Sequence, residues 1–518
     1  MSVALPRNFV HLMSAINLKR RFDRFEAVIG DLLLSDGLRG KAMRGGTWLG
    51  AGSVAEQAFR FARNILLTRL LAPSAFGAMA IVMSSSAIVG ALTEVGVRQA
   101  VIQNPRGAER AYLNAGWWLG LGRALGTYLI VFAMAPWVAH FYGIAGLSAL
   151  LRVTLLGALF DGAMSPRSIL AQKEMKFGRW MAISNGGGIC GVILTVALSL
   201  VLRDVWALAI GFGSENAFRC LFSYVLYPGL PSLRWEHQAI RDLYRFSKQA
   251  AGLSFLNLIF SRTDIFVLGK LYSTTALGLY TMGVALVLTP SSFLTTMMGQ
   301  TLFPAFAHVQ KDKERVNRIL VEATSWLVLF GLPAVVVIYL CGHSLLMVFY
   351  GPRYAAAAGP LAVAATVVFF NVLNAAITCV FTAMGRPGLH RRAVAASAVV
   401  MLIAIYPSCK LLGVVGGQVA ALLAITVSYF LQVIRMPVLT GLDLRRYAKA
   451  FVPTTLVSAG VLVTGLGARF LGLATRPTAN IALGASTCLI AYALRVPALI
   501  RIKQTARPQP AVRGAIAS

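Results

Sequence analysis

The sequence predicts an all-α membrane protein of about fourteen transmembrane helices, arranged as two pseudo-symmetric six-helix lobes followed by two further helices. Three observations predict this fold class: the composition, the alternation of basic and neutral gaps between apolar segments, and an internal repeat. The 518 residues are 57% apolar and only 13% charged, whereas soluble domains carry about 25% charged residues. Too little polar surface is therefore available to coat a soluble protein of this size.

The first 45 residues precede the first apolar run. They mix apolar residues such as Phe9 and Leu12 with basic ones such as Lys19 and Arg20. They lack the apolar core and small-residue cleavage site of a secretory signal peptide. We expect residues 1–45 to form a cytoplasmic amphipathic segment on the bilayer surface.

Apolar runs of the length that crosses a bilayer follow one another along the rest of the chain. Such runs favour helices over closed barrels, because a helix satisfies its own backbone hydrogen bonds in lipid. We predict fourteen spans: 46–69, 76–101, 113–135, 147–165, 179–201, 204–227, 248–269, 276–300, 318–341, 358–384, 393–408, 413–434, 450–470 and 478–496.

Basic residues gather in alternate gaps between these spans. Of the 48 Lys and Arg residues, 34 lie in or at the edges of one set of gaps and the termini, and only seven lie in the other set. By the positive-inside rule, the basic set faces the cytoplasm, so both termini are expected there, including a basic tail at 497–518. The net charge of +30 is then explained by loop retention and by attraction to anionic lipid headgroups, without a nucleic-acid partner.

The neutral gaps, on the outer side, are short. The longest predicted outer loops are 136–146 and 342–357. A membrane enzyme acting on large periplasmic substrates usually needs a domain or long loop there, so we expect a transporter rather than an enzyme. The chain also shows no nucleophile elbow, phosphate-binding loop or metal-ligand spacing, and we expect no catalytic residue, metal site or cofactor.

An internal repeat relates the two halves. At an offset of 201 positions Arg69 meets Lys270, and at an offset of 208 Phe141-Tyr142-Gly143 returns as Phe349-Tyr350-Gly351. Because each unit holds an even number of spans, the repeats are parallel and suit alternating access about a central cavity. We predict lobes at 46–235 and 236–440, with two extra helices at 441–496. Identical pairs at offset 201 are Leu67 with Leu268, Leu70 with Leu271, Ala75 with Ala276, and Gly77 with Gly278.

Several motifs resemble, in order and spacing, those of the polysaccharide-transporter (Wzx-like) branch of the multidrug/oligosaccharidyl-lipid/polysaccharide exporter (MOP) superfamily. The resemblance covers roughly residues 45–390, with Arg98 as a departure from the pattern. The matching stretches are Arg69 to Gly77, Glu94-Val95-Gly96 with Ile102-Gln103, Ala135-Pro136 with Phe141-Tyr142, Gln172-Lys173 to Phe177, Leu277 to Tyr280 with Phe303-Pro304, and Gly351 with Pro360-Leu361.

The resemblance implies a MATE-like fold and a place in the bacterial inner membrane. It also implies that the protein moves undecaprenyl-pyrophosphate-linked oligosaccharides from the cytoplasmic to the periplasmic leaflet, for exopolysaccharide, capsule or O-antigen assembly. The implied partners are this lipid-linked substrate, membrane lipids, and the polymerase and chain-length proteins of the same export pathway.

Charged residues inside the spans are the candidates for the site, because a charge in lipid is costly unless it faces a partner or a wet cavity. In three spans a Glu precedes an Arg by four residues, which places both side chains on one helix face. The pairs are Glu56 with Arg60, Glu94 with Arg98, and Glu215 with Arg219. Arg63 extends the first of these stripes, and we expect that helix to line the cavity.

The repeat places Arg262 and Asp264 of the second half at the depths of Phe61 and Arg63. We therefore predict a cationic cavity in which four guanidinium groups grip the pyrophosphate, because these groups stay charged and bind phosphate oxygens bidentately. Two acids are candidates for ion coupling, namely Glu56 and Asp264. An alternative is that each Glu–Arg pair neutralises itself and fixes helix packing. The predicted substrate-binding residues are Arg60, Arg63, Arg219 and Arg262.

Two other functions compete with lipid-linked oligosaccharide flipping. A cation-coupled exporter of small molecules, of the multidrug type, would share the superfamily but would favour acidic cavities for cationic drugs. A multi-span polysaccharide polymerase should show a long outer loop, which the predicted topology does not contain. The embedded arginines and the short outer loops favour the flippase.

Overall fold

The computed structural model describes most of the chain, and nearly all of the described residues are helical. No strand occurs among them. The predicted amphipathic segment lies outside the described residues except for its last part, because the first described helix begins at Leu38. The basic tail 497–518 and nearly all of the span 478–496 also lie outside them. The described residues are 38–93, 97–174, 176–232, 237–247, 251–470, 477, 481, 482, 484 and 486.

Each of the first thirteen predicted spans overlaps a long helix. These helices are α3 (Leu38–Leu70), α4 (Pro73–Thr93), α6 (Arg110–Tyr142), α7 (Leu147–Gly162), α9 (Phe177–Leu202), α10 (Val205–Leu226), α12 (Ala251–Leu271), α13 (Thr274–Val309), α14 (Lys313–Phe349), α15 (Ala358–Ala383), α16 (Pro387–Leu412), α17 (Gly416–Thr440) and α19 (Val452–Phe470). Shorter elements connect them: α5 (Val97–Gln103), η1 (Pro105–Ala108), η2 (Pro166–Ser168), α8 (Ile169–Lys173), α11 (His237–Ser247), η3 (Pro352–Ala357), η4 (Gly413–Val415) and α18 (Leu444–Lys449).

By length and hydropathy, seven helical stretches among the described residues can cross a membrane. They become eight if α7 and the helical segment Pro166–Lys173, bent by 70° at a short break, form one span. The protein is a multi-pass membrane protein, and the number fourteen stays a prediction. Helix α3, which carries Glu56, Arg60, Arg63 and Arg69, is not among these stretches.

Several helices extend further than their apolar runs. Helix α6 continues through Pro136 to Tyr142, and α14 continues to Phe349, so most of both predicted outer loops is helical. The predicted span 76–101 is divided between α4 and α5. Helix α14 has 37 residues, about 55 Å at 1.5 Å per residue, which exceeds the roughly 30 Å hydrocarbon core. Hydropathy marks where a helix enters lipid, whereas the helix itself runs on into the polar region.

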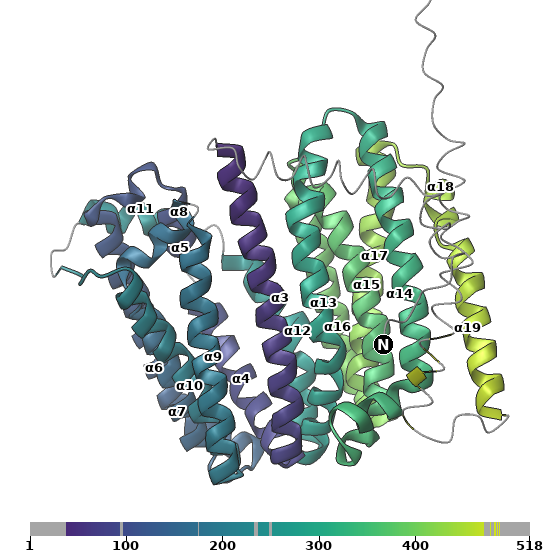
Figure 1. The fold of residues 1–518 in the computed structure, drawn as a ribbon, viewed down its shortest axis with the longest axis horizontal. Helices are drawn as coiled ribbons and strands as arrows, with labels where there is room; N and C mark the ends of the chain where they lie inside the picture. The colour runs from purple at the N-terminus through teal and green to yellow at the C-terminus, as the bar shows by residue number, and fades with distance from the viewer. Residues whose placement is uncertain are drawn as a thin grey trace, which may run out of the picture.

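The long helices stand side by side (Figure 1), with α6, α7, α9 and α10 on one side and α13 to α17 on the other. Between them, α4 packs against α13 and α12, and α3 packs against α9 and α13. Helix α11, which follows the predicted lobe boundary, packs against α5 and α6. We call α3 to α10 the first half, α12 to α17 the second half, and the end where α3 leads into α4 the α3–α4 end.

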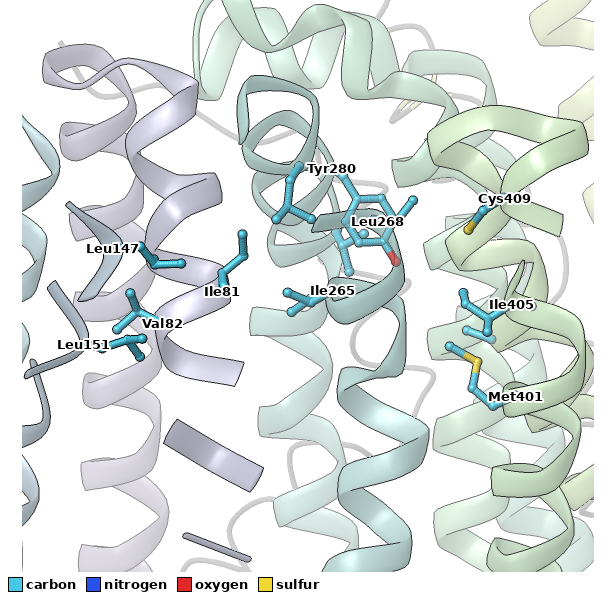
Figure 2. Packing of buried hydrophobic residues seen from close by; sticks show 14 of the residues in the cluster. Ile81, Val82, Leu147, Leu151, Ile265, Leu268, Tyr280, Met401, Ile405 and Cys409 are labelled. Atoms are coloured by element: carbon cyan, nitrogen blue, oxygen red, sulfur yellow. The ribbon is translucent and has the colours of Figure 1, made fainter. Parts of the chain in front are cut away.

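The halves share an apolar core toward the α3–α4 end. One buried cluster joins Ile81 of α4, Leu147 of α7, Leu268 of α12, Tyr280 of α13 and Cys409 of α16, and Figure 2 shows these side chains meeting from both halves. A second cluster joins α3 and α4 to α13 and α14. The burial of this apolar surface holds the two halves together at that end.

Away from the α3–α4 end, the buried clusters separate. Of the three remaining clusters among the described residues, one lies within the second half and its C-terminal neighbours, and two lie in the first half with α11. None of the three contains residues of both halves. Within the described residues, the halves are therefore joined by buried apolar contacts at one end and independently packed at the other.

Candidate functional site

Five charged side chains meet between α3 and α10. The Arg219 Nη2 atom lies 2.6 Å from Glu215 Oε1, and the Arg60 Nη2 atom lies 2.8 Å from Glu56 Oε1. Three longer contacts join the two helices: Glu215 lies 3.9 Å from Arg60 and 3.8 Å from Arg63, and Glu56 lies 4.0 Å from Arg219. We call these five residues the charge cluster. It brings together four of the six predicted site residues.

Glycines on α9 allow the cluster to form. A Cβ atom on Gly187 would lie 2.7 Å from the backbone nitrogen of Arg219, and one on Gly191 would lie 2.7 Å from the Cα atom of Glu215. Such distances are too short for any side chain, so only glycine lets α10 approach α9 this closely. The Nε atom of Arg219 also donates to the carbonyl oxygen of Ser184 on α9, at 3.3 Å. The close approach that these glycines of α9 allow thus places Glu215 and Arg219 within reach of the charged residues of α3.

The charge cluster contains three guanidinium groups and two carboxylates, which leaves a net charge of +1. Exposure of the side chains falls from 40% at Arg60 to 10% at Glu215. A cavity of about 20 Å³ lies among these residues, with Asn185 and Gly188 in its wall, which is room for about one water molecule. In this conformation the guanidinium groups are occupied by carboxylates.

The other two predicted site residues lie elsewhere. The Oδ2 atom of Asp264 accepts a hydrogen bond of 2.5 Å from the Tyr280 hydroxyl, which accepts one of 2.6 Å from Gln418 Nε2. The Oδ1 atom of Asp264 accepts from the backbone nitrogen of Ile265, at 2.8 Å. This network ties α12, α13 and α17 together beside the shared apolar core. Arg262 is half-buried on α12 and takes no part in the charge cluster.

Glu215, which was not among the predicted site residues, is the central member of the cluster, because it contacts all three arginines. The same four-residue spacing that selected Arg219 could have selected it. Tyr280 and Gln418 were also missed as partners of Asp264. Tyr280 stands in one of the motif stretches, but no spacing rule connects either residue to a carboxylate on another helix.

Comparisons with known proteins agree with this architecture. A family model described as polysaccharide biosynthesis protein matches residues 66–359. The lipopolysaccharide biosynthesis protein WzxC of Escherichia coli is 21% identical over 325 residues, which are 61% of this chain and 65% of that protein. The succinoglycan biosynthesis transport protein ExoT of Rhizobium meliloti is 23% identical over 300 residues, 57% of this chain and 60% of that protein. The chain thus spans about three fifths of the length of these relatives.

Solved structures show the same fold. The lipid II flippase MurJ, in an inward closed conformation, superposes with a TM-score of 0.70 at 12% identity, over 87% of this chain and 99% of that one. A multidrug resistance MATE family transporter of the MOP superfamily, in an inward-facing conformation, superposes with a TM-score of 0.52 at 15% identity, over 75% of this chain and 98% of that one. The MATE-like fold implied by the sequence resemblance is confirmed. Because the family model covers more than half of the chain, the protein belongs to the family of polysaccharide biosynthesis proteins.

Proposed function

We propose that the protein is a flippase that carries lipid-linked oligosaccharides across the bacterial inner membrane, from the cytoplasmic to the periplasmic leaflet, for the assembly of a surface polysaccharide. The observation that carries the proposal is the charge cluster, a net-positive group of arginines within a membrane-spanning half. A pyrophosphate attached to a lipid is an anion that such arginines recognise, and charged groups inside membrane spans often mark a substrate path.

The distribution of the buried clusters supports alternating access. The halves share apolar core toward the α3–α4 end and pack independently away from it. With the orientation predicted from the basic loops, the joined end faces the periplasm and both termini face the cytoplasm. This conformation is then closed to the periplasm, and rocking of one half against the other would expose the opposite side.

Substrate binding must compete with the carboxylates already in the cluster. Glu215 contacts all three guanidinium groups, and Glu56 contacts Arg60 and Arg219. A pyrophosphate can take these groups only if the carboxylates withdraw or become neutral, since like charges repel in a medium of low dielectric constant. Protonation or cation binding at Glu56 and Glu215 would therefore release the arginines to the substrate, which couples binding to an ion.

The comparisons support this substrate class. WzxC and ExoT are named for lipopolysaccharide and succinoglycan biosynthesis, and MurJ is a lipid II flippase. A net-positive cluster disfavours cationic drugs, so we place the chain with the polysaccharide flippases rather than the multidrug exporters. We also propose transport without catalysis, in a pathway whose polymerase and chain-length proteins take up the flipped units.

Deletion of the gene and complementation with the full chain test the proposal. We expect the deletion strain to lose its surface polysaccharide and to accumulate a lipid-linked saccharide on the cytoplasmic leaflet. Leaflet position is measured by the access of a membrane-impermeant lectin or glycosidase to intact and to broken spheroplasts. Normal surface polymer, or accumulation on the periplasmic leaflet, would refute the proposed role.

A further inference from the structure

A second basic site lies in the other half of the molecule, where α16 begins and α17 ends. A cavity of about 420 Å³ opens there, at the end opposite to the α3–α4 end. Three guanidinium groups line it, from Arg386 before the first turn of α16, Arg392 in its second turn and Arg435 near the end of α17. Its wall also includes Leu389, Val438 and Leu439. None of these residues belongs to the charge cluster.

These three arginines have no acid beside them within the described part of the chain. Among the residues that the structure describes, no carboxylate lies within ion-pair distance of Arg386, Arg392 or Arg435. By contrast, Arg315 pairs with Asp312 at 2.9 Å on the neighbouring helix α14. Three uncompensated guanidinium groups around one cavity form an anion site, and their planar donors match phosphate oxygens.

The cavity opens onto an apolar surface. Val438 is 83% exposed, and the exposed residues Ile434 and Leu431 continue the same face of α17 away from the cavity. Spacings of four and three residues place these side chains in one stripe along the helix. In a membrane-spanning helix this stripe faces the acyl chains. A ligand with an anionic head and an apolar tail can therefore fill the cavity and lie along the stripe at once.

The helices that carry the arginines are held rigidly behind the cavity. The Nε2 atom of Gln432 donates to Asn374 Oδ1 at 2.7 Å, and the Thr378 hydroxyl lies 3.0 Å from His390 Nδ1. These bonds link α15 to α17 and to α16. The turn before α16 is fixed as well, because Gly385 has a φ of +69° and the backbone nitrogen of Arg386 donates to Phe381 at 2.8 Å. The backbone that carries the three arginines is thus held in place, which lowers the entropy cost of binding.

We propose that this cavity binds the phosphate headgroup of an anionic membrane phospholipid. With the predicted orientation, that lipid belongs to the cytoplasmic leaflet. The positive-inside rule requires only that the loops carry positive charge. It does not require three arginines around one cavity beside a lipid-facing stripe, and that arrangement suits a single headgroup. The inference does not depend on the proposed substrate, because the two sites share no residue.

The test uses the full-length purified protein in detergent and native mass spectrometry to count bound lipids. The probes are phosphatidylglycerol, phosphatidylcholine and inorganic phosphate. We expect phosphatidylglycerol to bind tightly and phosphatidylcholine, whose choline neutralises the phosphate, to bind weakly. Loss of three surface charges, each worth about a fivefold change in affinity for anionic lipid, should weaken binding of phosphatidylglycerol to R386Q/R392Q/R435Q by at least about tenfold.

A matched variant, R391Q/R445Q/R446Q, removes the same charge from exposed arginines at the same end that do not line the cavity. If only the surface charge at this end mattered, it would lose as much affinity as R386Q/R392Q/R435Q; because its arginines do not line the cavity, we expect it to keep clearly more affinity for phosphatidylglycerol than R386Q/R392Q/R435Q does. Equal loss in both triple variants, or no loss in R386Q/R392Q/R435Q, would overturn the site. Displacement of the lipid by equimolar inorganic phosphate would show that the cavity binds free phosphate and not a lipid. If R386Q/R392Q/R435Q does not fold, the single variants R392Q and R435Q are compared with the control R391Q. The site then requires R392Q and R435Q to lose more affinity for phosphatidylglycerol than R391Q does.

Discussion

Gly77 near the start of α4 lies against Gly278 near the start of α13. A Cβ atom on Gly77 would overlap the carbonyl oxygen of Thr274, and one on Gly278 would overlap the carbonyl oxygen of Pro73. Each residue of this contact maps onto its counterpart at the repeat offset of 201. The contact is therefore reciprocal, and the local pseudo-symmetry axis between the two halves passes through it.

We expect Gly77→Ala and Gly278→Ala to push α4 and α13 apart, because the added methyl groups meet backbone that cannot move aside. Overpacking of this kind lowers the free energy of unfolding by about 1–3 kcal/mol. The measurement is the midpoint of thermal unfolding in detergent, which should fall in both variants. The matched controls are Gly90→Ala in α4 and Gly299→Ala in α13, where nothing lies within 4 Å of the added Cβ. Unchanged unfolding of both test variants would show that the contact does not hold the halves together.

A second reciprocal contact lies at the same end. The Arg69 Nη2 atom donates to the carbonyl oxygen of Val348 at 2.6 Å, and the Lys270 Nζ atom donates to that of Phe141 at 2.5 Å. Each cation thus reaches the last turn of a helix in the other half, where the carbonyl ends are negative. The offset of 201 predicted that Arg69 and Lys270 are equivalent, but not that each one bonds to the opposite half.

Removing both cations should loosen the α3–α4 end. We expect R69Q/K270Q to shift the conformations toward opening there, since each contact is worth about 0.3–1 kcal/mol. Spin labels on opposite halves, with distances measured by double electron–electron resonance, report the shift as a longer distance population. The control is Arg203→Gln, an exposed cation between α9 and α10. An unchanged distance distribution in R69Q/K270Q would contradict this role.

Glu215→Gln should lower the stability of the protein more than the substitution of any single arginine in the charge cluster. It leaves three guanidinium groups with one carboxylate in a site that is only partly exposed. Breaking such a network costs about 1–3 kcal/mol after allowance for solvent screening. The double variant E215Q/R219Q should recover part of this loss. Additive losses in this double-mutant cycle, measured by thermal unfolding, would exclude an energetic coupling between Glu215 and Arg219.

The charge cluster also shows what the sequence could and could not predict. The Glu56–Arg60 and Glu215–Arg219 pairs follow from spacing, because a helix places residues four apart on one face. The contacts of Glu215 with Arg60 and Arg63 depend on how closely α10 approaches α9 and α3, which the glycines of α9 decide. The repeat gave the depth of Arg262 and Asp264 but not the direction in which they point, so it could not separate them from the cluster.

We expect the arginines of the charge cluster to bind the pyrophosphate of the substrate. Arg60→Ala or Arg63→Ala should leave membrane insertion intact and abolish polymer export, since a hydrogen bond to a charged group is worth about 1.5–3 kcal/mol. Arg262→Ala tests the prediction from the repeat in the same way. Export is measured as surface polysaccharide in a complemented deletion strain, with Arg315→Ala on α14 as the control. Normal export by all three variants would remove the pyrophosphate-binding role, and Arg→Lys variants would show whether charge alone suffices.

Asp264 allows a structural role to be separated from ion coupling. Asp264→Asn keeps the shape of the side chain and an oxygen that can accept from Tyr280, so we expect the midpoint of unfolding to change little. Tyr280→Phe instead removes the hydroxyl that joins Asp264 to Gln418, which should cost about 1–3 kcal/mol because buried polar groups lose their partner. If Asp264 carries the coupling ion, D264N also abolishes the stimulation of flipping by an imposed proton or sodium gradient in proteoliposomes. Retained stimulation in D264N, with Y280F destabilised, would assign the network to packing and leave Glu56 and Glu215 as the coupling acids.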